Sequence, residues 1–143
     1  MQIGYLNKNS FVGLGASGPA VGANTRIVFA SVPIDDMSGW DGTKWNCKSA
    51  GEYKGVWYVR LNGTAPTVGQ FAGAYVLLNG ATKKKQNYAY VANTNVQTYY
   101  LVIPFQLKLN LNDYLEFYAD TNLTSSTIAT AVEDISVEIM KVG

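Results

Sequence analysis

Carboxylates are the first candidates for chemistry in this sequence. Asp35-Asp36 and Glu133-Asp134 form two adjacent pairs. Paired carboxylates can hydrolyse a glycosidic bond when they converge within about 5–10 Å. Neighbouring residues on a strand point to opposite faces, so neither pair converges on one substrate by itself. We therefore expect solvated carboxylates in turns, no catalytic residue and no enzyme.

Metal binding is the alternative use of these acidic side chains. Hard cations take carboxylate oxygens, so the pairs could join Asp41, Asp113 or Asp120 around calcium. No spacing among them resembles a dedicated calcium loop. The chain has no histidine and one cysteine, Cys47, which removes the usual general base, the usual zinc ligands and any disulfide framework. We predict no metal and no cofactor, and we expect Cys47 to be a buried core thiol beside Trp45.

A basic run and a group of tyrosines and asparagines follow the Asn79-Gly80 turn. The run Lys83-Lys84-Lys85 predicts a solvated loop tip, and contact with an anionic partner surface is the alternative. Aromatic faces beside amides suit sugar binding, because a sugar ring offers C–H groups for stacking and hydroxyls for hydrogen bonds. The candidate glycan-binding residues are Tyr88, Tyr90, Asn87 and Asn93.

Composition bounds the classes of partner. The chain has 143 residues, of which 48% are hydrophobic and 15% charged, and 11 basic residues stand against 10 acidic ones. A net charge of +1 argues against nucleic-acid binding, which needs a basic face. No apolar run approaches the ~18 residues of a spanning helix, and the N-terminus lacks the pattern of a signal peptide. We expect one domain with a real core, no nucleic acid and no membrane insertion.

The first 26 residues differ from the rest of the chain. They are rich in glycine and show no sustained period of two or of 3.6. We therefore divide the chain into a glycine-rich N-terminal arm, residues 1–26, and a folded domain, residues 27–143. We expect the arm to be irregular unless something holds it, and to attach the domain to a larger assembly. Met1 favours that reading, because it suggests that the chain begins at its own start codon.

From residue 27 onward the pattern is that of short strands. The strongest segment has six apolar residues at period two, from Tyr99 to Leu109. Pro33 is expected to end the first strand. No segment combines helical periodicity with a cap, so the sequence predicts an all-β sandwich, barrel or jelly roll. The expected strands are 27–32, 43–47, 53–61, 74–78, 98–109, 114–119 and a last one that contains residues 135–139.

Several outward faces of these strands are not polar. A sheet that is apolar on both sides must be covered, and the chain has no spare helix for this purpose. The expected cover is another copy of the same subunit. The predicted interface residues are Val56, Tyr58, Tyr100, Val102, Tyr114 and Tyr118, with Pro104 on the same strand face. Scattered surface tyrosines are the alternative explanation.

Two motifs of aromatic and turn residues follow each other in the sequence. The first is Phe29, Asp35 and Trp40, and the second is Trp45, Gly51 and Tyr53, with Trp57 at a later aromatic position. Their spacings resemble those of the globular heads of complement C1q, relatives of tumour necrosis factor (TNF). The segments 45–47, 75–80 and 135–139 are also similar to the family. The resemblance covers residues 27–143 and implies a homotrimeric C1q/TNF-like jelly-roll β-sandwich.

The sequence departs from the family pattern at three points. The gap from Trp40 to Trp45 is shorter than usual, Gly55 stands where phenylalanine is normal, and no collagen repeat precedes the domain. Gly55 could mark a bulge or a substitution. The matching positions are mostly core and turn positions, so they imply fold and trimer and not a ligand.

These observations favour a structural or attachment protein of a larger particle. We expect a trimeric bacteriophage virion protein, as head decoration, fibre or tail-tip knob, located on the virion surface or outside the cell. The alternative is a trimeric lectin or receptor-binding module for host glycans, with candidate loops at 62–74, 82–96 and 120–127. A tyrosine-lined surface away from the arm would favour the second function.

Overall fold

Strands and turns account for the whole described part of the protein. The computed structural model describes residues 9–18, 20–128 and 134–143, and no helix occurs in these residues. The all-β prediction is therefore confirmed. The strands are β1 (Ser10–Ala16), β2 (Thr25–Arg26), β3 (Phe29–Asp35), β4 (Trp45–Asn46), β5 (Gly51–Asn62), β6 (Phe71–Leu78), β7 (Thr82–Tyr90), β8 (Thr98–Leu109), β9 (Tyr114–Thr121), β10 (Thr127–Ile128) and β11 (Ile135–Lys141).

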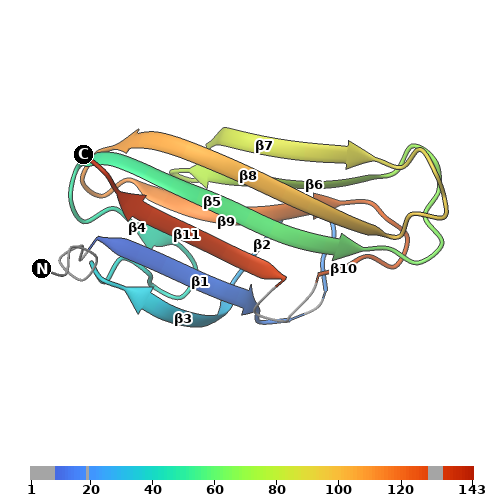
Figure 1. Cartoon of the computed structure of the whole chain (residues 1–143), viewed down its shortest axis with the longest axis horizontal. Coiled ribbons are helices and arrows are strands. Elements are labelled where there is room, and N and C mark those ends of the chain that lie inside the picture. The colour runs from blue at the N-terminus through green and yellow to red at the C-terminus, as the bar shows by residue number, and fades with distance from the viewer. Residues whose placement is uncertain (1–8, 19, 129–133) are drawn as a thin grey trace, which may run out of the picture.

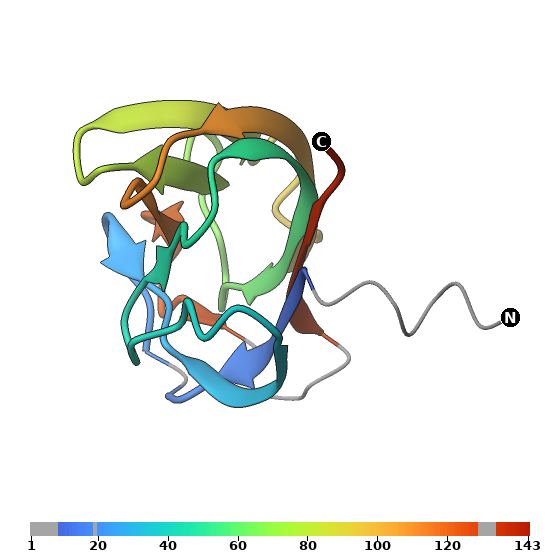
Figure 2. The ribbon, with the colours of Figure 1, turned by 90° about the vertical axis from the view of Figure 1, so that its left-hand side faces the viewer.

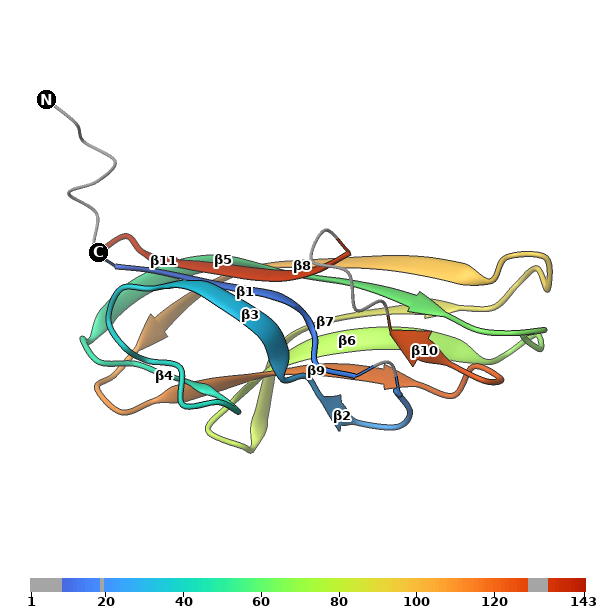
Figure 3. The ribbon, with the colours of Figure 1, turned by 90° about the horizontal axis from the view of Figure 1, so that it is seen from below.

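Two antiparallel sheets form the layers of a sandwich. Sheet 1 has the order β10-β5-β11-β1-β3, and β8 pairs with the other side of β5. Sheet 2 has the order β2-β9-β6-β7, and β4 also pairs with β9. Figure 3 shows the two layers from below, and Figure 2 faces the end of the sandwich at which the chain finishes.

Aromatic side chains fill the space between the layers. The rings of Phe29, Trp57 and Phe117 lie 5.7–5.9 Å apart, which joins both sheets in one cluster. The indole N–H of Trp57 donates to the carbonyl of Tyr118 across the core at 3.2 Å. Cys47 is fully buried, as predicted, and its Sγ lies 3.2 Å from the Ser49 carbonyl.

The longest ladder joins β5 to β8 without interruption. Their register runs from Gly51 opposite Leu109 to Asn62 opposite Thr98, so the alternation of residues 98–109 predicted this strand to the residue. Gly55 does not mark a bulge, because it pairs with both Phe105 and Ile139. The ring of Phe105 occupies the place where a Gly55 side chain would stand. A larger residue at Gly55 would therefore collide with it.

The expectation of an irregular arm over residues 1–26 is wrong for residues 10–16. β1 pairs with β11 on one side and with β3 on the other, and Phe11 is buried. The period of two was hidden because Gly13 and Gly15 occupy inner positions of the strand, which alternate with the outward Val12 and Leu14. A Cβ on Gly13 would lie 2.6 Å from the Phe29 ring, so glycine is required there. Residues 1–8 and residue 19 lie outside the described residues.

Strand edges correct two further expectations. Pro33 does not end β3, because β3 is an edge strand whose outer side needs no N–H donor. The run Lys83–Lys85 is not a loop tip but the first half of β7, the edge strand of sheet 2. Charged side chains on an edge strand oppose pairing with other chains. The Asn79-Gly80 turn behaves as predicted, with positive φ at both residues.

Both ends of the described chain lie at one end of the sandwich. Ser10 pairs with Met140, and the Lys141 N–H donates to the carbonyl of Asn9 at 3.2 Å. The loops that precede β6, follow β7 and precede β10 gather at the opposite end (Figure 1). We call these the terminal end and the far end.

Candidate functional site

An apolar row crosses the outer face of sheet 1. Ile34, Val12, Glu138, Val56 and Pro104 are successive cross-strand partners from β3 to β8. Only one of the five is charged, although this face of the sheet is turned away from the core. Figure 1 shows β1, β11, β5 and β8 side by side in this layer.

Four of the six predicted interface residues lie on this face. Tyr58 stands opposite Val102, and Val56 stands opposite Pro104. Val102 is 49% exposed and Tyr100 is 60% exposed, so nothing in the described chain covers them. We call this surface the apolar face; its apolar and tyrosine residues are Val12, Ile34, Val56, Tyr58, Tyr100, Val102, Pro104 and Met140.

A groove of about 560 Å³ deepens the apolar face near the terminal end. Its floor includes Gly55 and Phe105, and Lys54 and Glu138 belong to its lining. Gly55 takes part in this lining with its backbone, because the Phe105 ring occupies the place of its side chain. The sequence showed Gly55 only as a departure from a motif, and it did not predict a groove.

A polar group closes the apolar face toward the far end. Arg60 Nη2 lies 3.1 Å from Asp134 Oδ2, and Tyr100 stands opposite Arg60. Burial raises the pKa of Tyr58, and Tyr100 and Asp134 raise it further, whereas Arg60 lowers it. Of the Glu133-Asp134 pair, Asp134 is the ion-pair partner of Arg60, and Glu133 lies outside the described residues.

Tyr114 and Tyr118 do not belong to the apolar face. They lie on β9, which is in sheet 2, so the prediction that all six residues form one surface is wrong. Period two shows which residues share a strand face, but it does not show which sheet contains the strand.

The outer face of sheet 2 carries an aromatic network with polar partners. The rings of Tyr75 and Tyr118 stack at 5.0 Å with an angle of 6°, and the Lys83 ammonium lies 4.3 Å from the Tyr75 ring centre. The Tyr75 hydroxyl donates to Asn24 Oδ1 at 2.9 Å. Burial raises the pKa of Tyr75 to about 12, and Tyr118, Asp120 and Glu116 act in the same direction. Tyr75 is only 3% exposed.

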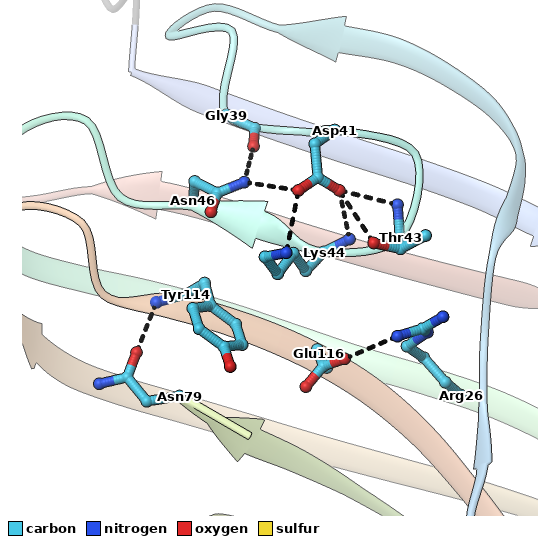
Figure 4. Close-up of polar contacts among 9 residues, drawn as sticks. All are labelled: Arg26, Gly39, Asp41, Thr43, Lys44, Asn46, Asn79, Tyr114 and Glu116. Atoms are coloured by element: carbon cyan, nitrogen blue, oxygen red, sulfur yellow. Dashed lines mark hydrogen bonds and ion pairs between the residues drawn. The ribbon is translucent and has the colours of Figure 1, made fainter. Parts of the chain in front are cut away.

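Ion pairs and short-range hydrogen bonds hold the rest of this face (Figure 4). Arg26 Nη1 lies 3.1 Å from Glu116 Oε2, and the Lys44 ammonium lies 5.1 Å from the Tyr114 ring centre. Partial burial opposes ionisation of Asp41, but donors from Thr43, Lys44 and Asn46 outweigh it and hold the Asp41 pKa far below its usual value.

The candidate glycan-binding residues separate into two groups. Tyr88 and Tyr90 share one side of β7, and Phe71 of β6 lies between them with ring-centre distances of 5.7 and 6.2 Å. Asn87 points to the other side, where its Nδ2 donates to the Val102 carbonyl at 3.4 Å. Asn93 lies in the next loop and accepts a hydrogen bond from the Asn95 N–H.

Tyr88, Phe71 and Tyr90 form what we call the aromatic row. Tyr90 is 67% exposed, and the Tyr88 hydroxyl donates to Asp120 Oδ2 at 2.7 Å. Burial and this hydrogen bond raise the pKa of Tyr88. Phe71 was not predicted as a site residue, because nothing in its local sequence places it between two tyrosines of another strand.

The acidic side chains serve separate local structures. Asp35 accepts the Gly39 and Trp40 N–H groups, and Asp113 accepts Asn79 Nδ2 at 2.9 Å. The Asn79 amide and the Asn110 N–H lower the pKa of Asp113. Within the described residues, no three acidic, histidine or cysteine side chains stand close enough to share a metal ion. None of the described residues belongs to a helix long and apolar enough to cross a membrane.

Solved structures share this architecture. The globular domain of zebrafish complement 1qA protein aligns with a TM-score of 0.64 and 10% identity, over 94% of this chain and 98% of that chain. Murine APRIL at pH 5.0 aligns with a TM-score of 0.71 and 10% identity, over the same shares. No family model and no curated protein matches the sequence. The likeness shows the fold: a C1q/TNF-like jelly roll, as the motif spacings predicted.

Proposed function

We propose that this protein is a homotrimeric globular module that attaches to, or builds, a larger particle. The apolar face of sheet 1 is the observation that carries the proposal. Its exposed valines and tyrosines lie on paired strands, β5 and β8, so they form one continuous surface. A large apolar patch rimmed by polar residues is typical of a protein–protein contact. The family that the motifs resemble forms trimers, which favours three copies.

The trimer is tested by the absolute mass in solution, measured by light scattering. A value near three times 15.5 kDa supports the proposal. A monomeric mass at every protein concentration measured contradicts the proposal, because the apolar face would then be exposed to water in the folded protein.

We further propose that the particle is a bacteriophage virion and that the segment before β1 attaches the module to it. The low charge content and the position of Ser10, the start of β1, at the terminal end support this assignment. The role is non-enzymatic, with the module on the virion surface or outside the cell. Deletion of residues 1–8 should leave the trimer intact and abolish incorporation into the particle, measured by sedimentation with purified particles. Undiminished incorporation would contradict the attachment role.

Glycan binding at the far end is the second candidate function. The aromatic row favours it, because Tyr90 is well exposed and β7 ends at the far end, away from the termini. A glycan array should show a ligand for the wild type that Tyr90→Ala loses and Tyr90→Trp, which keeps an aromatic face, retains. Equal binding by all three proteins would place the ligand elsewhere.

A further inference from the structure

A hollow beside the edge strand β8 contains Lys85, which the proposed functions do not use, and Lys54, which also lines the groove of the apolar face. It has a volume of about 320 Å³ and is lined by Lys54, Lys85, Pro104, Phe105 and Gln106. Lys54 comes from β5, Gln106 from β8 and Lys85 from β7 of the other sheet. We call it the lysine hollow.

A β-bulge directs Lys85 into this hollow. Lys83 pairs with Leu77 and Lys85 with Val76, so Lys84 is an extra residue in β7. Lys83 therefore faces outward, where its ammonium lies over Tyr75. Lys85 faces the side of the buried Val76, as does Asn87, which reaches the Val102 carbonyl of β8. A bulge can re-aim a side chain in this way.

The charges of the hollow have no partner in the described part of the chain. The ion pairs there join Arg26 to Glu116, Lys44 to Asp41 and Arg60 to Asp134, and none involves Lys54 or Lys85. Gln106 stands opposite Lys54 and adds an amide donor. Pro104 has no N–H, and Phe105 supplies an apolar wall.

We infer that the lysine hollow binds an oxyanion: a carboxylate, sulfate or phosphate group of a ligand. Two ammonium groups and the NH2 group of the Gln106 amide are donors that an anion in this hollow can accept from, and the two positive charges attract it. The side chains come from three strands of two sheets, so the sandwich and not a loop fixes the backbone positions that carry them. The hollow borders the proposed trimer contact, because Lys54 and Pro104 line both, and the inference does not depend on glycan binding.

The test is a titration of the full chain with sodium sulfate, inorganic phosphate and sodium acetate at constant ionic strength. Nuclear magnetic resonance follows the Gln106 side-chain amide. We expect a saturable shift, and affinity that falls roughly tenfold in Lys85→Gln and in Lys54→Gln. Lys44→Gln is the matched control, because it removes the same charge at a lysine that already has a carboxylate partner. The anion that binds most tightly identifies the ligand group.

Two results would overturn the inference. The first is the same shift in the wild type and in all three variants, which means non-specific screening. The second is a shift of the wild-type signal that does not saturate with any of the three anions, which means that the hollow has no oxyanion site.

Discussion

The two sheets present tyrosines to the outside in opposite ways. On sheet 1, Tyr100 is 60% exposed and its strand neighbour Val102 is 49% exposed. On sheet 2, Tyr75 is 3% exposed because Tyr118 stacks on it and Lys83 lies over its ring. Outward aromatic residues therefore do not by themselves mark an interface. A surface is a candidate interface when its aromatic rings remain exposed because no side chain of the same chain packs against them.

The largest expected effect is a charge on the apolar face. Val102→Glu should convert the proposed trimer into a monomer, because a carboxylate buried without a partner costs about 3–5 kcal/mol. Light scattering measures the change. Val68→Glu is the matched control, since Val68 is 63% exposed and lies outside sheet 1. A monomeric mass for both Val102→Glu and Val68→Glu, or for neither, would contradict the prediction that the apolar face of sheet 1 is the contact surface.

A charge on the other face should act on stability instead. Tyr118→Glu removes the stack on Tyr75 and places a carboxylate on the same strand face as Glu116. We expect unfolding to become easier by about 2–3 kcal/mol with no change in mass. Urea unfolding at fixed protein concentration measures this, and Tyr118→Phe should stay close to the wild type. A monomeric Tyr118→Glu would return Tyr118 to the interface.

Alkaline pH should lower the stability of the folded protein, in part through Tyr75 of sheet 2. The Tyr75 pKa is about 12 in the folded protein, against about 10 in an unfolded chain. The folded state therefore binds more protons between these values, so its stability is intact below pH ~10 and falls as pH rises toward 12. Tyr75→Phe should make the unfolding free energy less steep in this range. An unchanged slope would show that other groups govern the loss.

The smallest expected effect concerns Lys83. Lys83→Gln removes the ammonium over Tyr75, which is worth about 0.5–1 kcal/mol. Lys84→Gln, at the bulged position beside it, should change the unfolding free energy by less than about 0.5 kcal/mol. Equal effects of the two substitutions would mean that net charge, and not the contact with Tyr75, is responsible.

Local pattern predicted strands well and surfaces incompletely. The six alternating apolar residues of β8 were sufficient to predict that strand. β7 was not predicted, because an exposed edge strand can be polar throughout its first half. β1 was missed because glycines occupy its inner positions. Tyr114 and Tyr118 were assigned to the same surface as Tyr100 and Val102, because their two strands follow each other in the sequence and were expected to lie in one sheet. Sheet membership depends on long-range pairing, which a single sequence does not display.

The position of β1 between β11 and β3 has a mechanical consequence. A pull on Ser10 away from the far end acts along the strand, so the hydrogen bonds of both ladders share the force instead of opening one after another. If a particle held the module at the terminal end and a ligand bound at the far end, a force between the two would load the β1 ladders in shear. β1 would then carry the pulling force through its hydrogen bonds to β11 and β3.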